Sequence, residues 1–474
     1  MTAAAIALTA AGLAQAMAGT ILSGPVDAVF TGVSIDSRTL QKGNLFFAIV
    51  GERLNGHHYV QAAHAAGATG VVVSSASGWS GAWPEDLTVI GVDDTTLALQ
   101  RAAKSIRRAS GAQVVAITGS AGKTTTKEMT ADLLGTQFCV FRNHGNFNNH
   151  IGLPLSLVEL RQRPEIAVVE LGMNHAGEIR TLVDLAEPDV RVWTLVAEVH
   201  SAFFPSIEAI ADAKAEILDG ATSSTLVVAN AADPLVMARV AATPARVMTF
   251  GIDVPADVRA TDVRDEGLAG TRATVTTPNG RVSIRVPLIG RGHLANALAA
   301  MAVATHFGVP LDAMAERVAA FSPAAHRGEV WRLRGGITLV DDSYNSNPRA
   351  LQRTLEGIAA ETGCARRVAV LGEMLELGEQ AAALHEACGR AAAQAGIACL
   401  ITVGGAPAVA MAAGAVAAGM PASEVLHVTT SAEAAELIVP RLQAGDLLLV
   451  KGSRGIRTDM VVERVKAERS GAST

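Results

Sequence analysis

The chain has 474 residues, of which 49% are hydrophobic and 18% are charged, and its formal net charge is −6. This length predicts about three domains, and the apolar content excludes a mainly disordered chain. A mildly acidic chain without a basic run is a poor nucleic-acid binder, because such binding needs clustered Lys and Arg. We therefore expect no nucleic-acid partner.

The first twenty residues carry no charge, and the first basic residue is Arg38. A secretory signal would place a positive charge before its apolar core, so we expect a packed helix here, with a signal or anchor as the alternative. No other segment is apolar for long enough to span a bilayer as a helix. The four cysteines form no CxxC pair, which is typical of a reducing compartment. We expect a cytoplasmic monomer without stable membrane insertion.

Short apolar and β-branched runs in the first hundred residues predict strands, with helical stretches between them. The strands are expected at residues 33–35, 45–49, 70–73 and 88–92, and the helices at residues 59–68 and 97–108. A Ser-Gly pair at residues 110–111 is a plausible linker. These elements predict a small N-terminal α/β domain over residues 1–110.

From residue 113 strands alternate with helices, which is typical of a parallel βαβ sheet. Strands are expected at residues 114–117, 166–171, 192–196 and 226–230. The turn Pro278-Asn279-Gly280 lies between two alternating runs, and Asn-Gly in that position is a strong hairpin signal. A helix at residues 295–307 closes this section. We expect a central phosphate-loop domain over residues 111–321.

The last third of the chain again alternates apolar runs with Ala-rich helical stretches. The expected strands are residues 337–341, 368–371, 400–403 and 447–450. This pattern predicts a Rossmann-like α/β domain over residues 322–474.

A glycine-rich segment follows the first central strand and opens a helix at residues 126–134. It reads Gly119, Ser120, Ala121, Gly122, Lys123, Thr124 and Thr125. Glycines let the backbone present N–H groups to phosphate oxygens, and the helix N-terminus adds partial positive charge. Lys123 would reach the β- and γ-phosphates of ATP, and the Thr124 hydroxyl would bind Mg²⁺.

The usual phosphate loop has a glycine five positions before Gly122, where this chain has Ile117. The segment is therefore a shortened form, and a chance glycine-rich turn is the alternative. Kinases, GTPases, motors and ligases all use phosphate loops, so other motifs must decide the reaction.

Five further segments, together with the glycine-rich one, resemble the Mur ligases. They are residues 146–154 (NFNNHIGLP), 170–178 (ELGMNHAGE), 341–348 (DDSYNSNP), 371–378 (LGEMLELG) and 451–454 (KGSR). The resemblance runs from about residue 34 to about residue 464. The segments at 341–348 and 371–378 are the most specific, and they imply the activity that adds D-Ala-D-Ala to a peptidoglycan precursor.

Glu170 ends an expected buried strand, where side chains of an open α/β sheet point to the ligand crevice. A carboxylate there suits Mg²⁺, which prefers oxygen ligands, although a surface or capping glutamate is the alternative. The resemblance implies metal binding for Glu170 and for His200, and it implies that Lys214 is carbamylated and helps to hold a second Mg²⁺. Without the resemblance, His200 is a lone histidine and Lys214 an ordinary helix lysine.

The resemblance also implies the residues that bind ATP and the two other substrates. Asn296 would contact adenine, whereas His293 is displaced by one position from the family's histidine. The other implied nucleotide contacts are Arg327 and Asp342. The implied substrate contacts are Ser34, Asp36, Ser37 and Arg38 for the UDP-sugar, with Asn148, Tyr344, Asn345, Asn347, Lys451 and Arg454 for the peptide parts.

The resemblance implies an ATP-dependent ligase that joins D-Ala-D-Ala to the terminal carboxylate of a UDP-N-acetylmuramoyl tripeptide through an acyl phosphate. Such an intermediate needs shielding from water, so we expect the third domain to close on the central one about residues 322–327. Two alternatives stay open: another Mur-type or folylpolyglutamate ligase, and a phosphate-loop ATPase or nucleotide-binding module.

Overall fold

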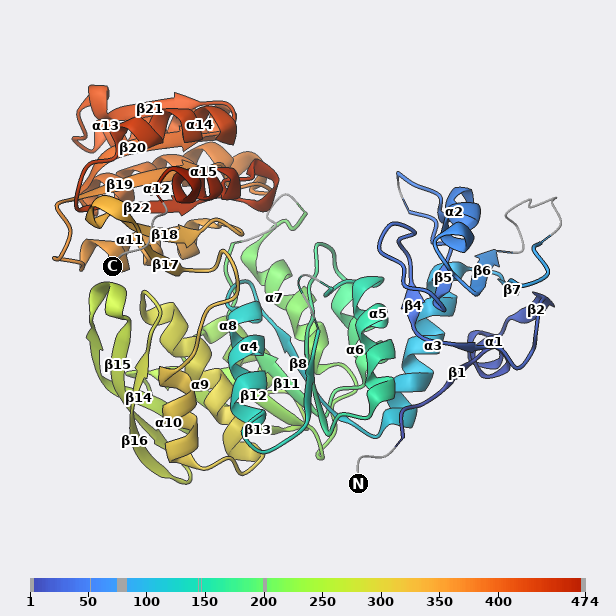
Figure 1. The fold of residues 1–474 in the computed structure, drawn as a ribbon. Helices are drawn as coiled ribbons and strands as arrows, with labels where there is room; N and C mark the ends of the chain where they lie inside the picture. Colours follow the sequence, from blue (N-terminus) through green and yellow to red (C-terminus); the bar gives the residue numbers. More distant parts are fainter. Residues whose placement is uncertain are drawn as a thin grey trace. The chain divides into compact units, whose positions relative to one another are not determined.

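The computed structural model describes residues 4–51, 53–74, 83–143, 145, 147–198 and 203–469 (Figure 1). Contacts within the chain divide it into two compact units. The first unit comprises Met1–Thr118, Gln137–Val192 and Glu216–Leu226, and the second comprises Gly119–Thr136, Trp193–Ala215 and Val227–Thr474.

A five-stranded sheet lies at the N-terminal end of the first unit. Its order is β2-β7-β6-β5-β4, with β2 antiparallel to β7 and the other neighbours parallel. The strands are β2 (Thr20–Ser23), β4 (Val33–Ser34), β5 (Leu45–Phe47), β6 (Gly70–Ser74) and β7 (Thr88–Val92), and the helices are α2 (Val60–Ala65) and α3 (Thr95–Ser110). The strands and helices predicted for this region are present, with ends shifted by a few residues.

The helix predicted over residues 1–20 is shorter in the structure. It is α1 (Ala10–Met17), and β1 (Leu8–Thr9) precedes it and pairs with β3 (Val29–Phe30). The hydroxyl of Thr9 accepts a hydrogen bond from the backbone N–H of Gly12, so Thr9 caps the helix and fixes its start.

The central sheet has nine strands in the order β16-β15-β14-β13-β12-β11-β8-β10-β9. Its strands are β8 (Gln113–Thr118), β9 (Val140–Arg142), β10 (Ile166–Glu170), β11 (Val190–Trp193), β12 (Leu226–Asn230), β13 (Arg246–Ile252), β14 (Val258–Asp265), β15 (Thr271–Thr277) and β16 (Gly280–Val286). Strand β10 is parallel to both β8 and β9. The predicted hairpin is confirmed, since β15 and β16 are antiparallel and Thr277 pairs with Gly280.

The strand predicted at residues 192–196 ends earlier, at Trp193. Residues 194–197 leave the sheet because their polar groups bond to the glycine-rich loop instead: the hydroxyl of Thr194 donates to the carbonyl of Ala121, and the N–H of Ala197 donates to the hydroxyl of Ser120. Strands β13 and β14 were not predicted.

Seven helices pack around the central sheet in the described residues. They are α4 (Lys123–Leu134), α5 (Gly152–Val158), α6 (Glu178–Ala186), α7 (Ile207–Ala215), α8 (Pro234–Val240), α9 (Arg291–His306) and α10 (Leu311–Ala319). Helices α4 and α9 lie side by side in the second unit (Figure 1). Gly122, which precedes α4, packs against Asn296 in the second turn of α9, so the N-terminal ends of the two helices lie close together.

The C-terminal sheet has the order β17-β18-β22-β19-β20-β21 and is parallel except for β17. Its strands are β17 (Glu329–Arg332), β18 (Thr338–Asp342), β19 (Arg366–Gly372), β20 (Ile397–Val403), β21 (Val425–Val428) and β22 (Asp446–Lys451). Its helices are α11 (Pro348–Ala359), α12 (Ala381–Gln394), α13 (Ala406–Ala417), α14 (Ser431–Ile438) and α15 (Asp459–Arg469).

Helices cover both faces of this C-terminal sheet. Leu351 of α11, Cys388 of α12 and Met411 of α13 belong to one apolar core, whereas Ile438 of α14 and Val461 of α15 belong to another. A parallel sheet buried on both faces is a doubly wound α/β fold, and its ligands bind at the carboxyl ends of the strands. The predicted Rossmann-like fold is confirmed, and β18, β19 and β22 lead into the segments singled out in the sequence.

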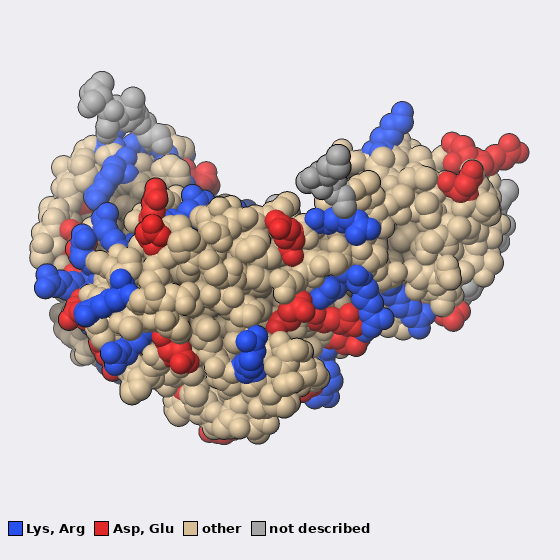
Figure 2. Space-filling view, turned by 90° about the horizontal axis from the view of Figure 1, so that it is seen from below, with Lys and Arg blue, Asp and Glu red and all other residues tan. Residues whose placement is uncertain are grey.

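Acidic and basic side chains are interspersed on the face shown in Figure 2. No helix in the described part of the chain combines the length and the apolar character that a bilayer-spanning segment needs. All four cysteines are free.

Candidate active site

The glycine-rich loop joins the end of β8 to the start of α4, and two of its glycines cannot be replaced without a clash. Gly119 has φ +147°, and a Cβ there would lie 1.9 Å from the hydroxyl oxygen of Thr194. Gly122 has φ +82°, and its Cβ would lie 2.2 Å from Oδ1 of Asn296. The loop therefore needs glycine at both positions for conformation and for close packing.

Residues 194–197 hold the loop from the side. The N–H of Ser120 donates to the carbonyl of Leu195 at 2.9 Å, and the hydroxyl of Ser120 donates to the carbonyl of Ala197 at 3.1 Å. The hydroxyl of Thr194 donates to the carbonyl of Ala121 at 2.7 Å. These bonds fix the loop before any ligand arrives. Sequence reasoning missed the contact of this segment with the loop, because most of the bonds use backbone groups of Leu195 and Ala197, which no motif reveals.

The first turn of α4 carries the predicted phosphate-binding residues. Its Lys123 ammonium donates to the carbonyl of Gly119 at 2.9 Å, so the lysine folds back over the loop. Thr124 and Thr125 are buried. A helix N-terminus behind a glycine-rich turn is an anion site, because its first N–H groups lack partners within the helix and its dipole is positive there.

Lys214 lies near the end of α7 and is only 2% exposed. Burial, reinforced by the positive charge of Lys123, lowers the pKa of Lys214 well below its usual value of 10.5. A lysine that is easily deprotonated is a nucleophilic amine, which is the form that reacts with carbon dioxide. The structure thus gives Lys214 the property that carbamylation requires.

Glu170 is the last residue of β10, as predicted, and is 4% exposed. Its Oε1 accepts a hydrogen bond from the side-chain amide of Asn148 at 2.8 Å. Its backbone N–H donates to Oδ1 of Asn143 at 3.1 Å. Within the first unit, the structure therefore places Asn148 against Glu170, and the amide orients the carboxylate. His200 lies outside the described residues.

Two residues in the first turns of α9 lie near the glycine-rich loop or the C-terminal strands. Asn296 is buried beside Gly122. The Nδ1 atom of His293 is buried and has no hydrogen-bond partner in the described part of the chain. Burial lowers the pKa of His293 to about 4, against the opposing charge of Asp342, so the imidazole is neutral at pH 7.

The carboxyl ends of β18 and β22 are joined by an ion pair. The ammonium of Lys451 donates to Oδ2 of Asp342 at 2.6 Å and to the carbonyl of Asn345 at 3.0 Å. Oδ2 of Asp342 also accepts from the hydroxyl of Thr354, at 3.3 Å. Lys451 therefore orients Asp342 and the backbone of the loop that follows β18.

Tyr344 contacts two of the predicted arginines. The guanidinium of Arg327 lies 4.1 Å from the centre of the Tyr344 ring, and that of Arg454 lies 5.6 Å from it. Cation–π contacts of this kind position a guanidinium while leaving its N–H groups available. Asn347 caps α11 through a bond from the N–H of Ala350 at 2.9 Å.

A cavity of about 240 Å³ brings the glycine-rich loop together with the C-terminal loops. Its lining comprises Ser120 and Lys123 from the loop region, Asn345–Asn347 after β18, Leu375–Leu377 after β19, and Ser453–Gly455 after β22. Predicted nucleotide and substrate residues thus share one cavity within the second unit. Glu376 and Ser453 were not predicted as site residues, although both lie in the segments that carry the resemblance.

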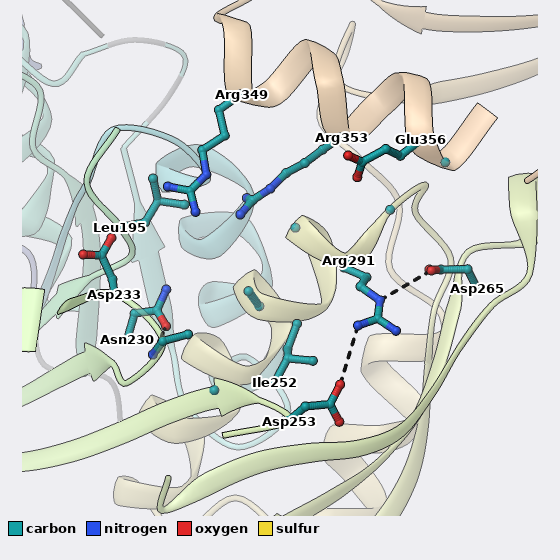
Figure 3. Close-up of a pocket in the computed structure, with 16 residues that line it drawn as sticks. Leu195, Asn230, Asp233, Ile252, Asp253, Asp265, Arg291, Arg349, Arg353 and Glu356 are labelled. Carbon is teal, nitrogen blue, oxygen red and sulfur yellow. Dashed lines mark hydrogen bonds and ion pairs between the residues drawn. The ribbon is translucent and has the colours of Figure 1, made fainter. Parts of the chain in front are cut away.

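A second cavity of about 480 Å³ lies next to the glycine-rich loop, with Leu195 in its wall (Figure 3). Arg349 and Arg353 of α11 point toward it, and Nη1 of Arg349 donates to the carbonyl of Val196 at 3.2 Å. On the opposite side, Arg291 forms ion pairs of 3.5 Å with Asp253 and with Asp265. No sequence motif marked this cavity, because its residues come from segments far apart in the chain.

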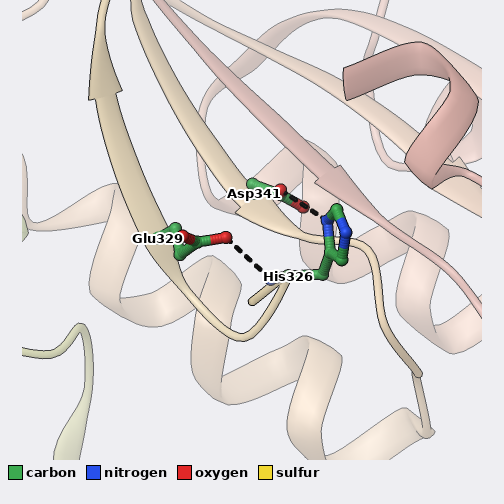
Figure 4. A group of neighbouring side chains, drawn as sticks. All are labelled: His326, Glu329 and Asp341. Atoms are coloured by element: carbon green, nitrogen blue, oxygen red, sulfur yellow. Dashed lines mark hydrogen bonds and ion pairs between the residues drawn. The ribbon is translucent and has the colours of Figure 1, made fainter. Parts of the chain in front are cut away.

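Two carboxylates, those of Glu329 and Asp341, lie beside His326, the residue before Arg327 (Figure 4). Nδ1 of His326 bonds to Oδ2 of Asp341 at 2.8 Å, and its backbone N–H donates to Oε2 of Glu329 at 2.8 Å. Asp341 also accepts from the hydroxyl of Ser343 at 2.6 Å. The imidazole of His326 and the carboxylates of Glu329 and Asp341 could together bind a metal ion. The hydrogen bonds of His326 to the two carboxylates already fix the segment that carries Arg327.

The segment predicted to hold the UDP-sugar is a turn in the first unit. Arg38 forms a two-pronged pair with Asp36, at 2.9 and 2.7 Å, and this contact lowers the pKa of Asp36 to about 2. The hydroxyl of Ser34 donates to the carbonyl of Asp36 at 3.1 Å. Arg38 is largely exposed, so its guanidinium is accessible to a ligand, and Ser37 lies within the same turn.

Family models match almost the whole chain in three parts. They are the Mur ligase family catalytic domain at residues 29–121, the Mur ligase middle domain at residues 117–304, and the Mur ligase glutamate ligase domain at residues 326–454.

Individual relatives match over nearly their full length. The UDP-N-acetylmuramoyl-tripeptide--D-alanyl-D-alanine ligase of Bacillus subtilis is 33% identical over 96% of this chain and 97% of the relative. The crystal structure of MurF from Acinetobacter baumannii has a TM-score of 0.85 and is 27% identical, covering 98% of this chain and 100% of that one. MurF from Thermotoga maritima in complex with ADP has a TM-score of 0.79 and is 27% identical, covering 92% and 97%.

These matches agree with the three α/β parts of the fold and with the motifs that the sequence presents at the strand ends. The chain belongs to the Mur ligase family.

Proposed function

We propose that this protein is an ATP-dependent ligase that joins D-Ala-D-Ala to the terminal carboxylate of a UDP-N-acetylmuramoyl tripeptide, in peptidoglycan precursor synthesis. The observation that carries the proposal is the cavity shared by Lys123 of the phosphate loop and by Asn345, Asn347 and Arg454 of the C-terminal loops. A phosphoryl-transfer residue and candidate peptide-binding residues face the same space. The Bacillus subtilis relative carries this activity in its name.

The chemistry solves the poor reactivity of a carboxylate. At pH 7 the carboxylate repels a nucleophile, and its oxygen is a poor leaving group. Transfer of the γ-phosphoryl group of ATP to that oxygen makes an acyl phosphate, whose phosphate leaves readily. Lys123 and the N-terminus of α4 stabilise the negative charge that gathers during the transfer. The amine then attacks the acyl carbon, and the tetrahedral intermediate collapses to an amide.

ATP would lie with its phosphates on the glycine-rich loop and its nucleoside toward the 480 Å³ cavity. Leu195 supports this placement, because its carbonyl accepts from Ser120 of the loop and its side chain lines the cavity. We assign Asn296, Arg327 and Asp342 to the nucleotide: Asn296 lies beside Gly122, and a guanidinium fork matches phosphate geometry.

Magnesium is proposed from the chemistry of the donors. The Thr124 hydroxyl and the Glu170 carboxylate are buried oxygen groups, and Mg²⁺ prefers oxygen ligands. A carbamylated Lys214 would add a carboxylate, also at a buried position. His200 is proposed as a further ligand on the resemblance alone. The ion would supply charge neutralisation on the phosphoryl oxygens. Among the described residues, Asn148 orients Glu170 for such a role.

We further propose that residues 1–110 hold the UDP-sugar, residues 111–321 hold ATP, and residues 322–474 bring the amine. The protein would act in the cytoplasm as a monomer, with Ser34, Asp36, Ser37 and Arg38 contacting the UDP-sugar.

Mass spectrometry of the reaction products tests the proposal. Purified protein with ATP, Mg²⁺, UDP-muramoyl tripeptide and D-Ala-D-Ala should yield UDP-muramoyl pentapeptide, ADP and phosphate. Lys123→Ala should abolish the product, whereas Lys42→Ala, a change at an exposed lysine, should not. ATP cleavage at full rate without the tripeptide would contradict the proposal and would favour a phosphate-loop ATPase.

A further inference from the structure

The 240 Å³ cavity contains one carboxylate whose role the proposed function leaves open. Among the described residues that line it, the charged ones are Lys123, Glu376 and Arg454. Lys123 is assigned to phosphate. A dipeptide brings an ammonium group at one end and a carboxylate at the other, so it needs both a negative and a positive partner. Glu376 and Arg454 supply those two charges.

The backbone around Glu376 is held in an unusual conformation. Glu376 has φ +64°, a left-handed value that is unfavourable for a residue with a Cβ. Such outliers persist where the surroundings fix them and are concentrated at functional sites. Glu376 lines the cavity together with the next residue, Leu377, which is buried and anchors this turn in the core.

Two hydrogen bonds fix the loop just before Glu376. The N–H of Met374 donates to Nε2 of His385 at 2.8 Å, and the N–H of Leu375 donates to the hydroxyl of Ser453 at 3.0 Å. Burial lowers the pKa of His385, which keeps the imidazole neutral and Nε2 free to accept. Glu376 therefore projects from a rigid segment that is tied to the loop bearing Arg454.

Arg454 is placed to take the other end of the dipeptide. Its guanidinium lies 5.6 Å from the ring centre of Tyr344 and 3.7 Å from Oδ2 of Asp459. By contrast, Lys451 is buried and already paired with Asp342. Of these two cations near the end of β22, Arg454 is the one that lines the cavity.

We propose that Glu376 binds the ammonium group of the incoming D-amino dipeptide and accepts its proton, so that the free amine can attack the acyl phosphate. This inference rests on the proposed function. The ammonium carries three protons and the amide keeps one. One proton passes from the ammonium group to Glu376 and then to water. The free amine forms a carbon–nitrogen bond to the acyl carbon. The carbon–oxygen bond to phosphate then breaks, and the second proton leaves with the phosphate.

Glu376→Gln tests the assignment, with Glu379→Gln as the matched control. Glutamine keeps the size and backbone of the residue at position 376, and Glu379 is exposed in the same segment but does not line the cavity. Glu376→Gln should lower kcat/KM for D-Ala-D-Ala by roughly ten- to a hundredfold, the loss expected when one hydrogen bond to a charged group is removed. The KM values for ATP and for the tripeptide should stay unchanged, as should all constants of Glu379→Gln.

Hydroxylamine separates a chemical role for Glu376 from a structural one. It is uncharged at neutral pH and carries no carboxylate, so it can attack the acyl phosphate without an ammonium site. Glu376→Gln should therefore retain the wild-type rate of hydroxamate formation. Its defect with D-Ala-D-Ala should also shrink above about pH 8, where α-amino groups lose their proton in solution.

Three results would overturn the inference: an unchanged kcat/KM for D-Ala-D-Ala in Glu376→Gln, an equal loss with hydroxylamine, or the same loss in Glu379→Gln. Failure of the proposed function looks different. In that case the wild-type protein would form neither amide nor hydroxamate from the tripeptide.

Discussion

At the scale of single residues, burial and charge decide which side chains can react. Lys214 is the clearest case in the second unit, because it combines almost complete burial with a strongly lowered pKa. Glu170 shows the complementary arrangement in the first unit, where a buried carboxylate is oriented by the amide of Asn148. The sequence predicted that Glu170 ends a buried strand, but it did not predict the contact with Asn148, and Lys214 by itself looked like an ordinary helix lysine.

Lys214→Met should stabilise the protein while removing its ligase activity. The unfolded chain binds a proton at Lys214 up to about pH 10.5, whereas the folded chain releases it at lower pH. Below that pH, Lys214 therefore lowers the free energy of unfolding. The loss is about 1.4 kcal/mol for each tenfold by which the folded chain binds this proton more weakly than the unfolded chain. Methionine has no such cost.

Urea denaturation in CO₂-free buffer measures the effect of Lys214→Met. The gain in unfolding free energy should be larger at pH 7 than near pH 10.5, because the cost of the lysine disappears as the pH approaches the pKa of the unfolded chain. Lys42→Met, at an exposed position, serves as control and should show no such trend. A variant at Lys214 that is less stable than the wild type at pH 7 would contradict the argument.

At the scale of elements, the glycine-rich loop shows what local sequence can and cannot predict. The strand before it, the helix after it and the hairpin of β15 and β16 follow from short-range patterns, and the structure contains them. The role of segment 194–197 does not follow from such patterns, because its bonds to Ser120 and Ala121 join parts of the chain that are far apart in sequence. The same reason hides the contact of Arg327 with Tyr344 and the wall of the 480 Å³ cavity.

Strand β17 was missed for a different reason. Only two of its four residues, Val330 and Trp331, are apolar, and both are exposed at the sheet edge, so the strand lacks the longer apolar run by which buried strands were recognised. Its pairing with β18 is a tertiary feature. Short motifs thus predicted candidate site residues, whereas edge strands and contacts between distant segments could be seen only in the fold.

Gly119→Ala should weaken nucleotide binding by more than the strain of a positive φ at an alanine would explain. A Cβ at Gly119 would lie 1.9 Å from the hydroxyl oxygen of Thr194, so the bond from Thr194 to the loop must break. Gly111 also has a positive φ, but a Cβ there meets nothing within 4 Å. Gly111→Ala therefore measures the backbone strain, roughly 1–2 kcal/mol, without the clash.

Equilibrium binding of an ATP analogue distinguishes the two glycine variants. Gly119→Ala should bind at least tenfold more weakly than the wild type, the equivalent of about 1.4 kcal/mol, whereas Gly111→Ala should bind normally. Equal affinities of all three proteins would show that the close packing of the loop does not matter for nucleotide binding.

At the scale of the whole molecule, the account requires the C-terminal domain to move relative to the central domain. An acyl phosphate would be hydrolysed by water that reaches it, and lids of this kind close when substrate binds. Residues 322–327 lie between α10 and β17 and belong to neither. Since His326 is bonded to Asp341 and Glu329 of the C-terminal sheet, we expect the chain to bend in the part of this segment that precedes His326.

Small-angle scattering measures this closure. The radius of gyration should fall when a non-hydrolysable ATP analogue and UDP-muramoyl tripeptide are both present, and should change less with either alone. Identical radii with and without both substrates would exclude closure of this kind.

The central claim is that ATP activates the terminal carboxylate of the tripeptide, and isotope transfer tests it most directly. UDP-muramoyl tripeptide labelled with ¹⁸O in that carboxylate is turned over with ATP and D-Ala-D-Ala, and the released phosphate is analysed by mass. The account predicts that each phosphate formed with an amide carries oxygen from the carboxylate. Phosphate without the label, released while the amide forms, would contradict it.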